Sequence, residues 1–273
     1  MTLWTVLLAC SGQETLVDTA VIADTAVPPA ADVKPVDVPA TNPLDDALNT
    51  SSGPIVFYPD THGTLRIDVA GTNIWVDPWT KAGLQGFKAD LILITDNHFD
   101  HLDTAAIEAV RKPGTVVVAP PVVAAELAKA NLPDLPVTVM KNGEKTEILG
   151  IKFEAIPMYN LVRGPEEGGL FHDKGRGNGY ILEFGNGRVY IAGDTECTDE
   201  MKALTDINVA FVPMNLPYTM PPAEAAACVT AFKPKVVYPY HYFGSDLSEF
   251  ETPVATAGIE VRKREWYPKG SPF

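Results

Sequence analysis

The sequence predicts a fold in which two β-sheets are covered by helices on their outer sides. Three observations support this prediction. From residue 55 onward, short strand-like segments alternate with segments of helical periodicity. Turns that contain glycine, such as Gly185-Asn186-Gly187, separate neighbouring strand segments. The 273 residues are 46% hydrophobic, which suits one α/β domain of ordinary size or two small ones.

Each expected strand is a short apolar or β-branched segment, and each expected helix is a segment with apolar side chains at helical spacing. The expected strands cover residues 55–58, 64–70, 73–76, 91–94, 115–119, 137–140, 145–148, 152–157, 179–184, 188–192, 209–212, 235–238 and 260–263. The expected helices cover residues 104–111, 122–130, 198–204, 222–231 and 247–252. No internal repeat of fixed period is visible in the sequence.

The N-terminus resembles a bacterial lipoprotein signal. It reads MTLWTVLLACSG, a short apolar run that ends at Leu8-Ala9-Cys10. This resemblance implies that residues 1–10 are a signal segment and that a lipid on Cys10 anchors the protein in the cell envelope. No lysine or arginine precedes the apolar run, which departs from the pattern. If the match is accidental, we expect a cytoplasmic protein.

Residues 11–53 are rich in Ala, Val, Asp, Thr and Pro, and they contain seven acidic residues and one lysine. Such a composition cannot bury enough surface to offset the entropy of ordering, so it predicts a disordered acidic tether. The folded domain is then expected at residues 54–273, where no segment is long and apolar enough to cross a bilayer. The formal charge of the whole chain, −14, argues against a nucleic-acid partner.

The three cysteines predict no disulfide framework, because none belongs to a CxxC pair. Cys228 lies in the apolar run AAACV, which is typical of a buried thiol. Cys197 follows a candidate metal ligand closely, and a thiolate ligand there is the weaker alternative.

The most informative segment is ITDNHFDHLD, residues 94–103. Directly after the apolar run LILI it brings four metal-competent side chains into six residues: Asp96, His98, Asp100 and His101. Imidazoles with carboxylates suit zinc, iron or manganese. Three further ionisable residues also follow expected strands: Asp77, Asp194 and His241. One aspartate at a strand end is usually a turn former, but these positions together predict a metal site.

In order along the chain, these residues match the motif series of the metallo-β-lactamase fold hydrolases. The surrounding segments WVDPW, NGYILEFGNGRVYIAGDTE and PYTMPPAEAA, the last leading to KPKVVYPYHY, resemble one branch of that family. This branch includes the ascorbate-phosphate lactonases and N-acyl-phosphatidylethanolamine phospholipase D. The resemblance covers about residues 55–263. It implies an α+β four-layer αββα sandwich with a binuclear metal site between the two sheets.

The resemblance also implies a role for each matched residue. The implied ligands are Asp96, His98 and a third residue for the first ion, and Asp100, His101 and His241 for the second, with Asp194 bridging both ions. Asp77 matches a supporting residue that contacts the ligands. Asp96 departs from the family, which usually has histidine there, and a third carboxylate favours manganese or iron over zinc.

The third ligand of the first ion is a second departure. In the family it commonly follows the strand expected at residues 152–157, where this chain has Tyr159 and Asn160. The nearest histidine is His172, in a loop rich in glycine that is long enough to fold over a pocket. His172 is therefore the expected ligand, with an exposed loop imidazole as the alternative. The residues expected to contact the ligands or the substrate are His62, Tyr159, Asn160 and Tyr218.

Two divalent ions, zinc foremost, would supply a bridging hydroxide that attacks an ester, lactone or phosphodiester bond. The resemblance thus implies a metal-dependent hydrolase that acts on a small-molecule or lipid-like substrate. Asp100 or Asp194 would accept the proton of the water, and His172 or His62 would stabilise the developing charge. Asp96 also leaves an alternative open, a non-catalytic or single-metal binding lipoprotein that retains the hydrolase fold.

Overall fold

The computed structural model describes residues 46–84, 86–130 and 132–267, and the expected signal segment lies outside this part of the chain. The strands of the first sheet, in spatial order, are β1 (Ala47–Thr50), β2 (Gly53–Thr61), β3 (Thr64–Val69), β4 (Thr72–Val76), β5 (Leu91–Leu93), β6 (Val116–Ala119) and β7 (Val137–Val139). Those of the second are β14 (Glu260–Val261), β13 (Val236–Tyr240), β12 (Val209–Pro213), β11 (Gly187–Ile191), β10 (Gly177–Phe184), β9 (Ile151–Met158) and β8 (Lys145–Ile148).

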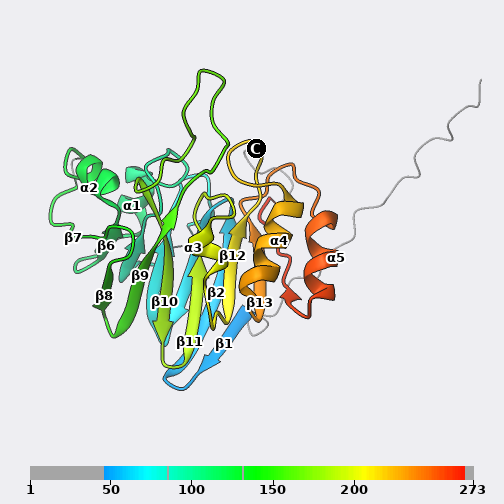
Figure 1. Cartoon of the computed structure of the whole chain (residues 1–273). Coiled ribbons are helices and arrows are strands. Elements are labelled where there is room, and N and C mark those ends of the chain that lie inside the picture. The colour runs from blue at the N-terminus through cyan, green and yellow to red at the C-terminus, as the bar shows by residue number, and fades with distance from the viewer. Residues whose placement is uncertain (1–45, 85, 131, 268–273) are drawn as a thin grey trace, which may run out of the picture. The chain divides into compact units, whose positions relative to one another are not determined.

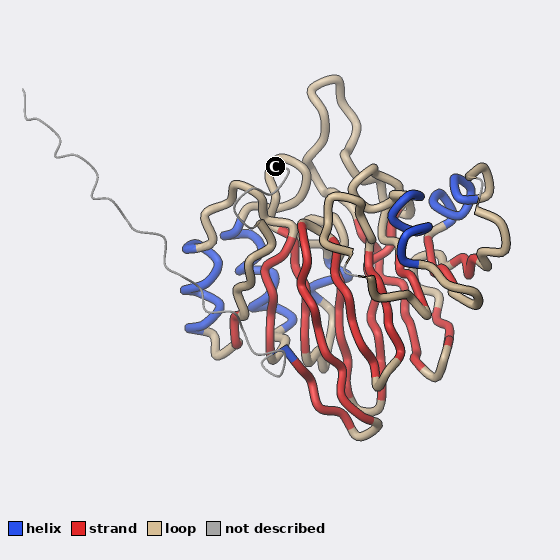
Figure 2. Tube along the Cα trace, turned by 180° about the vertical axis from the view of Figure 1, so that it is seen from behind, coloured by secondary structure: helices blue, strands red, loops and turns tan. Residues whose placement is uncertain are grey.

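Helices cover the outer face of each sheet, as Figures 1 and 2 show. The helices are α1 (Thr104–Val110), α2 (Pro121–Leu127), α3 (Asp199–Lys202), α4 (Pro222–Phe232) and α5 (Ser248–Thr256). The first two pack on the first sheet and the other three on the second. The predicted four-layer αββα sandwich is confirmed.

The alternation of side chains along the strands produces these layers. In β4, Ile74 and Val76 point into the core between the sheets, whereas Trp75 between them packs with the helices on the outside. Ile92 of β5 joins the same outer cluster as Ile107 of α1. Successive side chains of a strand point to opposite faces. The core between the sheets covers one face of these central strands and the helices cover the other, so both faces are buried. Burying each such side chain contributes about 1.5–3 kcal/mol.

The N-terminal boundary of the folded part differs from the expectation. Residues 47–50 form β1, which pairs in antiparallel fashion with the start of β2, so the expected tether cannot extend to Gly53. Asp46 is buried and accepts hydrogen bonds from Tyr238 Oη at 2.7 Å and from Arg264 Nε at 2.9 Å. The acidic composition of this segment predicted a disordered tether exposed to solvent, but Asp46 is buried and bonded to residues near the C-terminal end of the domain. No helix in the described ranges has the length and apolar character that a membrane span needs.

Strand direction explains where the ionisable residues gather. Strands β4 to β7 are parallel to one another, and so are β11 to β14. The carboxyl ends of parallel neighbours lie at one edge of a sheet. Asp77 and Asp96 follow β4 and β5, whereas Asp194 and His241 follow β11 and β13. The loops after these strands therefore bring residues from both sheets to the same edge of the sandwich.

Candidate metal centre

Three groups of side chains in the described part of the chain have the spacing of metal ligands, and two of them share His241. Within each group the ligand atoms lie within 4.8 Å of one another. The groups are Asp96, His98 and His172; His101, Asp194 and His241; and His62, Asp100 and His241. All seven residues that the sequence predicted as ligands are thus brought together, and His62 joins them.

Asp194 lies between the groups. Its Oδ2 atom is 3.6 Å from His172 Nε2, and its Oδ1 atom is 3.5 Å from His241 Nε2. Oδ2 is also 3.5 Å from His101 Nε2. A carboxylate that lies between imidazoles of two groups in this way has the geometry of a bridging ligand.

Unpaired polar atoms in this cluster fit a metal ion. Asp96 Oδ1, His101 Nε2 and Asp194 Oδ1 are buried and have no hydrogen-bond partner among the described residues. A buried acceptor without a partner costs about 1–3 kcal/mol, and a bound cation would remove that cost. The oxygen and imidazole donors also match the chemistry of zinc, manganese and iron.

Neighbouring imidazoles keep the carboxyl groups ionised. Burial alone would raise the pKa of Asp96, but a hydrogen bond with His98 and the surrounding imidazoles lower this pKa to about 2. Burial also opposes ionisation of Asp100 and Asp194, and their imidazole neighbours, His101 among them, hold both pKa values well below the usual range. Ionised carboxylates are the form that binds a metal ion.

The histidines do not share one protonation state. Burial lowers the pKa of His172 to about 4, and burial with the neighbouring His241 lowers that of His62 to about 4. Burial acts on His101 in the same direction, but the adjacent carboxylates, led by Asp100, raise its pKa well above the ordinary value. His62 and His172 therefore offer neutral imidazoles at neutral pH, whereas His101 would have to release its Nε2 proton for that atom to bind a metal ion.

Asp77 fixes the orientation of His101. His101 Nδ1 donates to Asp77 Oδ2 at 2.8 Å, which leaves Nε2 directed toward Asp194. Both carboxylate oxygens of Asp77 also accept from Thr95, one from its backbone N–H at 2.8 Å and one from its hydroxyl at 2.6 Å. The structure thus places Asp77 in contact with the candidate ligand His101.

Asn160 holds His172 in the same way. Its Oδ1 atom accepts from both the backbone N–H and Nδ1 of His172, each at 2.8 Å, so Nε2 is free to face the cluster. Asn160 Nδ2 donates to the buried Glu196 at 3.0 Å and to the carbonyl of Tyr218 at 2.8 Å. Glu196 forms an ion pair with Arg163 at 2.9 Å. His172 is buried, which removes the alternative of an exposed loop imidazole.

An arginine offsets the charge of Asp96, the residue at which this chain departs from the family pattern. Arg176 Nη2 donates to Asp96 Oδ2 at 2.9 Å and to His98 Nε2 at 2.6 Å. Its Nε donates to Asn97 at 2.8 Å, and its Nη1 to the carbonyl of Phe171 at 2.9 Å. Arg176 therefore connects the long loop between β9 and β10 to the loop that follows β5.

His62 lies in the turn between β2 and β3, with a left-handed φ of 58°. Its Nε2 atom is 3.1 Å from Asp100 Oδ2, and its Nδ1 atom is 2.7 Å from Tyr267 Oη. The ring centroids of His62 and His241 are 3.6 Å apart. His241 also has a left-handed φ, 46°. Strained backbone of this kind persists where the surrounding structure requires it, often at functional sites.

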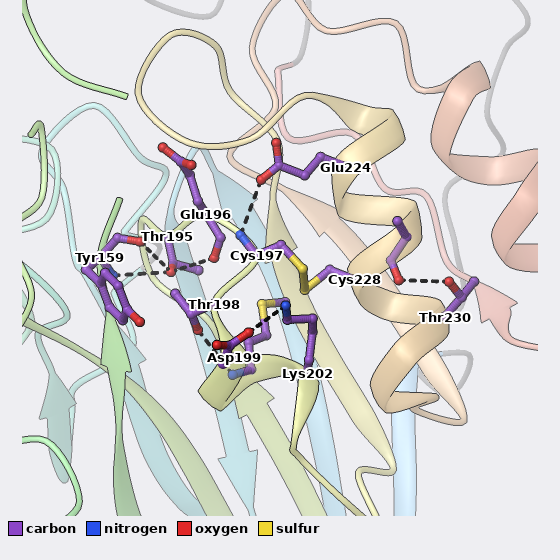
Figure 3. The surroundings of a disulfide bond; sticks show 12 residues. Tyr159, Thr195, Glu196, Cys197, Thr198, Asp199, Lys202, Glu224, Cys228 and Thr230 are labelled. Atoms are coloured by element: carbon purple, nitrogen blue, oxygen red, sulfur yellow. Dashed lines mark hydrogen bonds and ion pairs between the residues drawn. A yellow bond between two sulfur atoms is a disulfide. The ribbon is translucent and has the colours of Figure 1, made fainter. Parts of the chain in front are cut away.

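The loop that carries Asp194 is held rigidly. Gly193 has a φ of 65°, and a Cβ atom there would lie 2.4 Å from Met158 Sδ. Three residues beyond Asp194, Cys197 forms a disulfide bond with Cys228 of α4 (Figure 3). The expectations of a free Cys228 thiol and of Cys197 as a possible ligand are therefore wrong. The two cysteines are 31 residues apart in sequence, yet their Cα atoms are 5.6 Å apart because α4 packs beside this loop.

A cavity of about 450 Å³ opens onto the cluster. The lining residues are His62, His98, Phe99, Asp100, Phe171, His172, Asp194, Asn215, Leu216, Pro217, Tyr218, His241 and Phe243. Tyr218 lines the cavity, as the sequence predicted for a substrate contact. Tyr159 does not, because its hydroxyl donates to Glu200 at 2.9 Å. Its backbone N–H and carbonyl instead contact the hydroxyl of Thr195, next to Asp194.

Sequence reasoning missed several residues of the site. Arg176 belongs to no motif and stands between Gly175 and Gly177 at the start of β10, whereas Glu196 ends the segment GDTE but was not predicted as a site residue. Phe99 lies inside the segment that contains the candidate ligands, but it cannot bind a metal ion and was not predicted as a site residue. Phe171 directly precedes the candidate ligand His172, and Phe243 follows His241 by two residues, but nothing in the sequence showed that their rings line the cavity.

Two helix-covered β-sheets that carry aspartate and histidine clusters at their shared edge define a metal-dependent hydrolase of the metallo-β-lactamase fold. Residues 60–241 match the beta-lactamase superfamily domain, and the chain belongs to this superfamily. A UPF0173 metal-dependent hydrolase from Methanopyrus kandleri is 28% identical over 214 residues, which are 73% of this chain and 91% of that protein. Another from Koribacter versatilis is 32% identical over 195 residues, covering 66% of this chain and 81% of that protein.

Solved structures agree with this assignment. The crystal structure of a candidate metal-dependent hydrolase from Parabacteroides distasonis is 40% identical and has a TM-score of 0.74. The match covers 81% of this chain and 98% of that one. A metallo hydrolase from Ignicoccus hospitalis has the same fold, with a TM-score of 0.63 at 24% identity over 77% of this chain and 94% of that one.

Proposed function

We propose that this hydrolase uses two divalent ions, zinc foremost, to cleave an ester, lactone or phosphodiester bond. The observation that carries the proposal is the position of Asp194 between imidazoles of two candidate ligand groups, with buried unpaired ligand atoms beside an open cavity. His98 and His172, with Asp96, would hold the first ion. His101 and His241, with Asp100, would hold the second.

The ions would supply an activated water and would polarise the bond to be cleaved. The side chains around the ions would accept the proton of this water and hold the ions in place. Asp100 lines the cavity and is the acceptor for the proton of the attacking water. His62 Nε2, 3.1 Å from the Asp100 carboxylate, can share that proton. His172 faces the cavity from the opposite group, where Asn160 holds its Nδ1 atom and leaves Nε2 available for the first ion.

Metal content and turnover test this function together. Purified without chelator, the protein should carry close to two equivalents of zinc, manganese or iron per chain and should hydrolyse at least one member of an ester, lactone and phosphodiester panel. Asp194→Ala should lose both metal and turnover. Asp199→Ala is the matched control, because that side chain is 93% exposed and its ion pair within the described residues is with the nearby Lys202. One equivalent or less in the wild type, even after metal is added back, contradicts the two-ion proposal.

We also propose that the protein works in the cell envelope, anchored by a lipid on Cys10. The lipoprotein-like N-terminus supports this location. The disulfide bond between Cys197 and Cys228 supports it independently, since disulfides persist in oxidising compartments. In a bacterial host, the full chain should fractionate with membranes, and Cys10→Ser should release it from them. Equal membrane association of both forms would refute the anchor.

A further inference from the structure

The mouth of the metal cavity is apolar. Apart from the ligand-type side chains and Asn215, the lining residues are Phe99, Phe171, Leu216, Pro217, Tyr218 and Phe243. They come from four loops, which follow β5, β9, β12 and β13. Phe99 is 74% exposed and Leu216 is 50% exposed. A concave apolar surface next to convergent polar groups is typical of a ligand site.

The rings at this mouth have defined neighbours. Phe171 and Tyr218 pack edge to face with centroids 5.1 Å apart. Phe243 packs on Tyr267 at 5.3 Å, outside the cavity lining. Aromatic pairs of this geometry stabilise one another beyond the burial of their area. The apolar walls are therefore positioned before any ligand arrives.

The cavity lacks positive side chains. Among the described residues that line it, none is a lysine or an arginine. The cations of the nearby loop have acidic partners: Arg163 pairs with Glu196 and Glu224, Arg176 with Asp96, and Lys174 with Glu200. A phosphate or carboxylate remote from the bond to be cleaved would find no counter-charge there, and the net charge of −14 opposes anionic ligands.

We propose that the substrate is a carboxylic ester or lactone with an apolar acyl chain, which lies between Phe99, Phe171, Leu216 and Phe243. This inference rests on the proposed function and makes it specific. Hydrolysis forms a bond from the water oxygen to the acyl carbon and breaks the acyl C–O bond. The leaving alkoxide takes up a proton, and the apolar carboxylic acid departs. Substrates that carry a phosphate away from the reacting bond are excluded by the same cavity.

Binding of simple carboxylates tests the inference without turnover. Linear acids from acetate to octanoate are titrated by calorimetry into the metal-loaded wild type. The dissociation constant should fall with each added methylene by up to about fourfold, the factor for full burial of a CH₂ group. Equal affinity for acetate and octanoate, or tighter binding of glycerol phosphate than of octanoate, would overturn the proposal.

Variants locate the acyl site. Phe99→Ser and Phe243→Ser should weaken octanoate at least about fivefold, less than the loss expected from a fully buried phenyl group. Val139→Ser is the matched control, since this side chain is 47% exposed on β7 and does not line the cavity. Metal content is measured for each protein, so that a lost ion is not mistaken for a lost acyl contact. Unchanged octanoate affinity in both phenylalanine variants contradicts the assignment.

Turnover separates this inference from the proposed function. If octanoate binds tightly but no ester, lactone or phosphodiester is hydrolysed, the proposed function fails and the apolar ligand site stands. If acetyl and octanoyl esters of 4-nitrophenol have equal kcat/KM and the affinity for carboxylates does not change with chain length, the inference fails and the proposed function stands. Binding to phosphatidylcholine vesicles, without any chain-length dependence for monomeric acids, would assign the apolar mouth to a membrane surface and overturn the proposal.

Discussion

At the scale of single residues, one amide determines how the first ligand group is presented. Asn160 occupies the place where the resemblance predicted a ligand, and it instead accepts a hydrogen bond from Nδ1 of the ligand-type residue His172. Its Nδ2 atom anchors it to Glu196, so the amide cannot turn freely. A partner of this kind fixes the tautomer and the ring orientation of a ligating histidine.

We therefore expect Asn160→Ala to weaken metal binding at the first group by about 10–100-fold, the usual effect of removing such a partner. Metal content after dialysis against a weak chelator measures this loss, and circular dichroism shows whether the fold is kept. Asn186→Ala, in the exposed β10–β11 turn, is the control. Full metal content in Asn160→Ala would show that Asn160 does not position His172.

At the scale of elements, the disulfide bond connects the loop after β11 to α4 (Figure 3). Closing a loop with a sequence separation of 31 residues should stabilise the fold by about 3–4 kcal/mol, mainly by restricting the unfolded chain. Cys228→Ser should lower the free energy of unfolding by that amount in a urea titration. Reductant should lower the wild-type value to that of the variant and leave the variant unchanged. A wild type that is insensitive to reductant would contradict the expectation.

Asp103, the residue directly before helix α1, joins this helix to the loop that carries Asp100 and His101. Asp103 caps this helix by accepting from the backbone N–H groups of Ala105 and Ala106, and it also accepts from Thr80. Burial opposes its ionisation, but the hydrogen bonds from Thr80 and from the helix lower the pKa of Asp103. Since the folded pKa lies below the unfolded one, this stabilisation is present above the unfolded pKa, about 3.9, and is lost as the pH falls through the folded pKa.

Asp103→Ala should accordingly lower the free energy of unfolding by about 0.5–2 kcal/mol at neutral pH. The difference from wild type should narrow as the pH falls below about 4, where the unfolded aspartate becomes protonated. Urea titrations of both proteins across pH 3–7 measure it. Asp103→Asn keeps a capping oxygen and serves as the control, with a smaller loss. A difference that widens in acid would contradict the assigned role.

Most helices and strands could be predicted from the sequence, because their apolar residues recur with helical or strand periodicity. Every expected strand and helix has a counterpart in the structure. β1 was missed because its four residues, ALNT, follow an acidic proline-rich segment and show no alternation of their own. The disulfide was missed because pairing of Cys197 with Cys228 depends on the packing of α4 against the loop after β11, which no local pattern encodes.

At the scale of the whole molecule, the site exists only because two sheets end at one edge. The motif after β5 could be recognised locally, and the sequence order of the ligand candidates was readable from the resemblance. The contribution of Arg176 and the apolar mouth could not be predicted, since Arg176 and Phe171 lie between β9 and β10 and the other apolar lining residues come from three further loops. Long loops of this kind follow no periodic pattern.

This convergence makes the stability of the whole fold depend on the metal. Asp96, Asp100 and Asp194 are drawn into one buried cluster, and donor atoms there are left without partners among the described residues. An ion that binds only the folded state stabilises it by about 2.7 kcal/mol at a free concentration of 100 times Kd. For a domain of this size, that energy corresponds to a shift in Tm of roughly 5–10 °C.

Chelation should therefore lower the Tm of the wild type by roughly 5–10 °C, and adding back the ion should restore it. Differential scanning calorimetry of the purified protein, with and without chelator, measures the shift. Asp194→Ala should melt at one temperature in both conditions, because the ligand shared by both groups is gone. Asp199→Ala should respond like the wild type. If the wild type lost its ions without any change in Tm, the ligand cluster would be stabilised by its own ion pairs, His101 with Asp77 foremost, and the metal would serve the reaction alone.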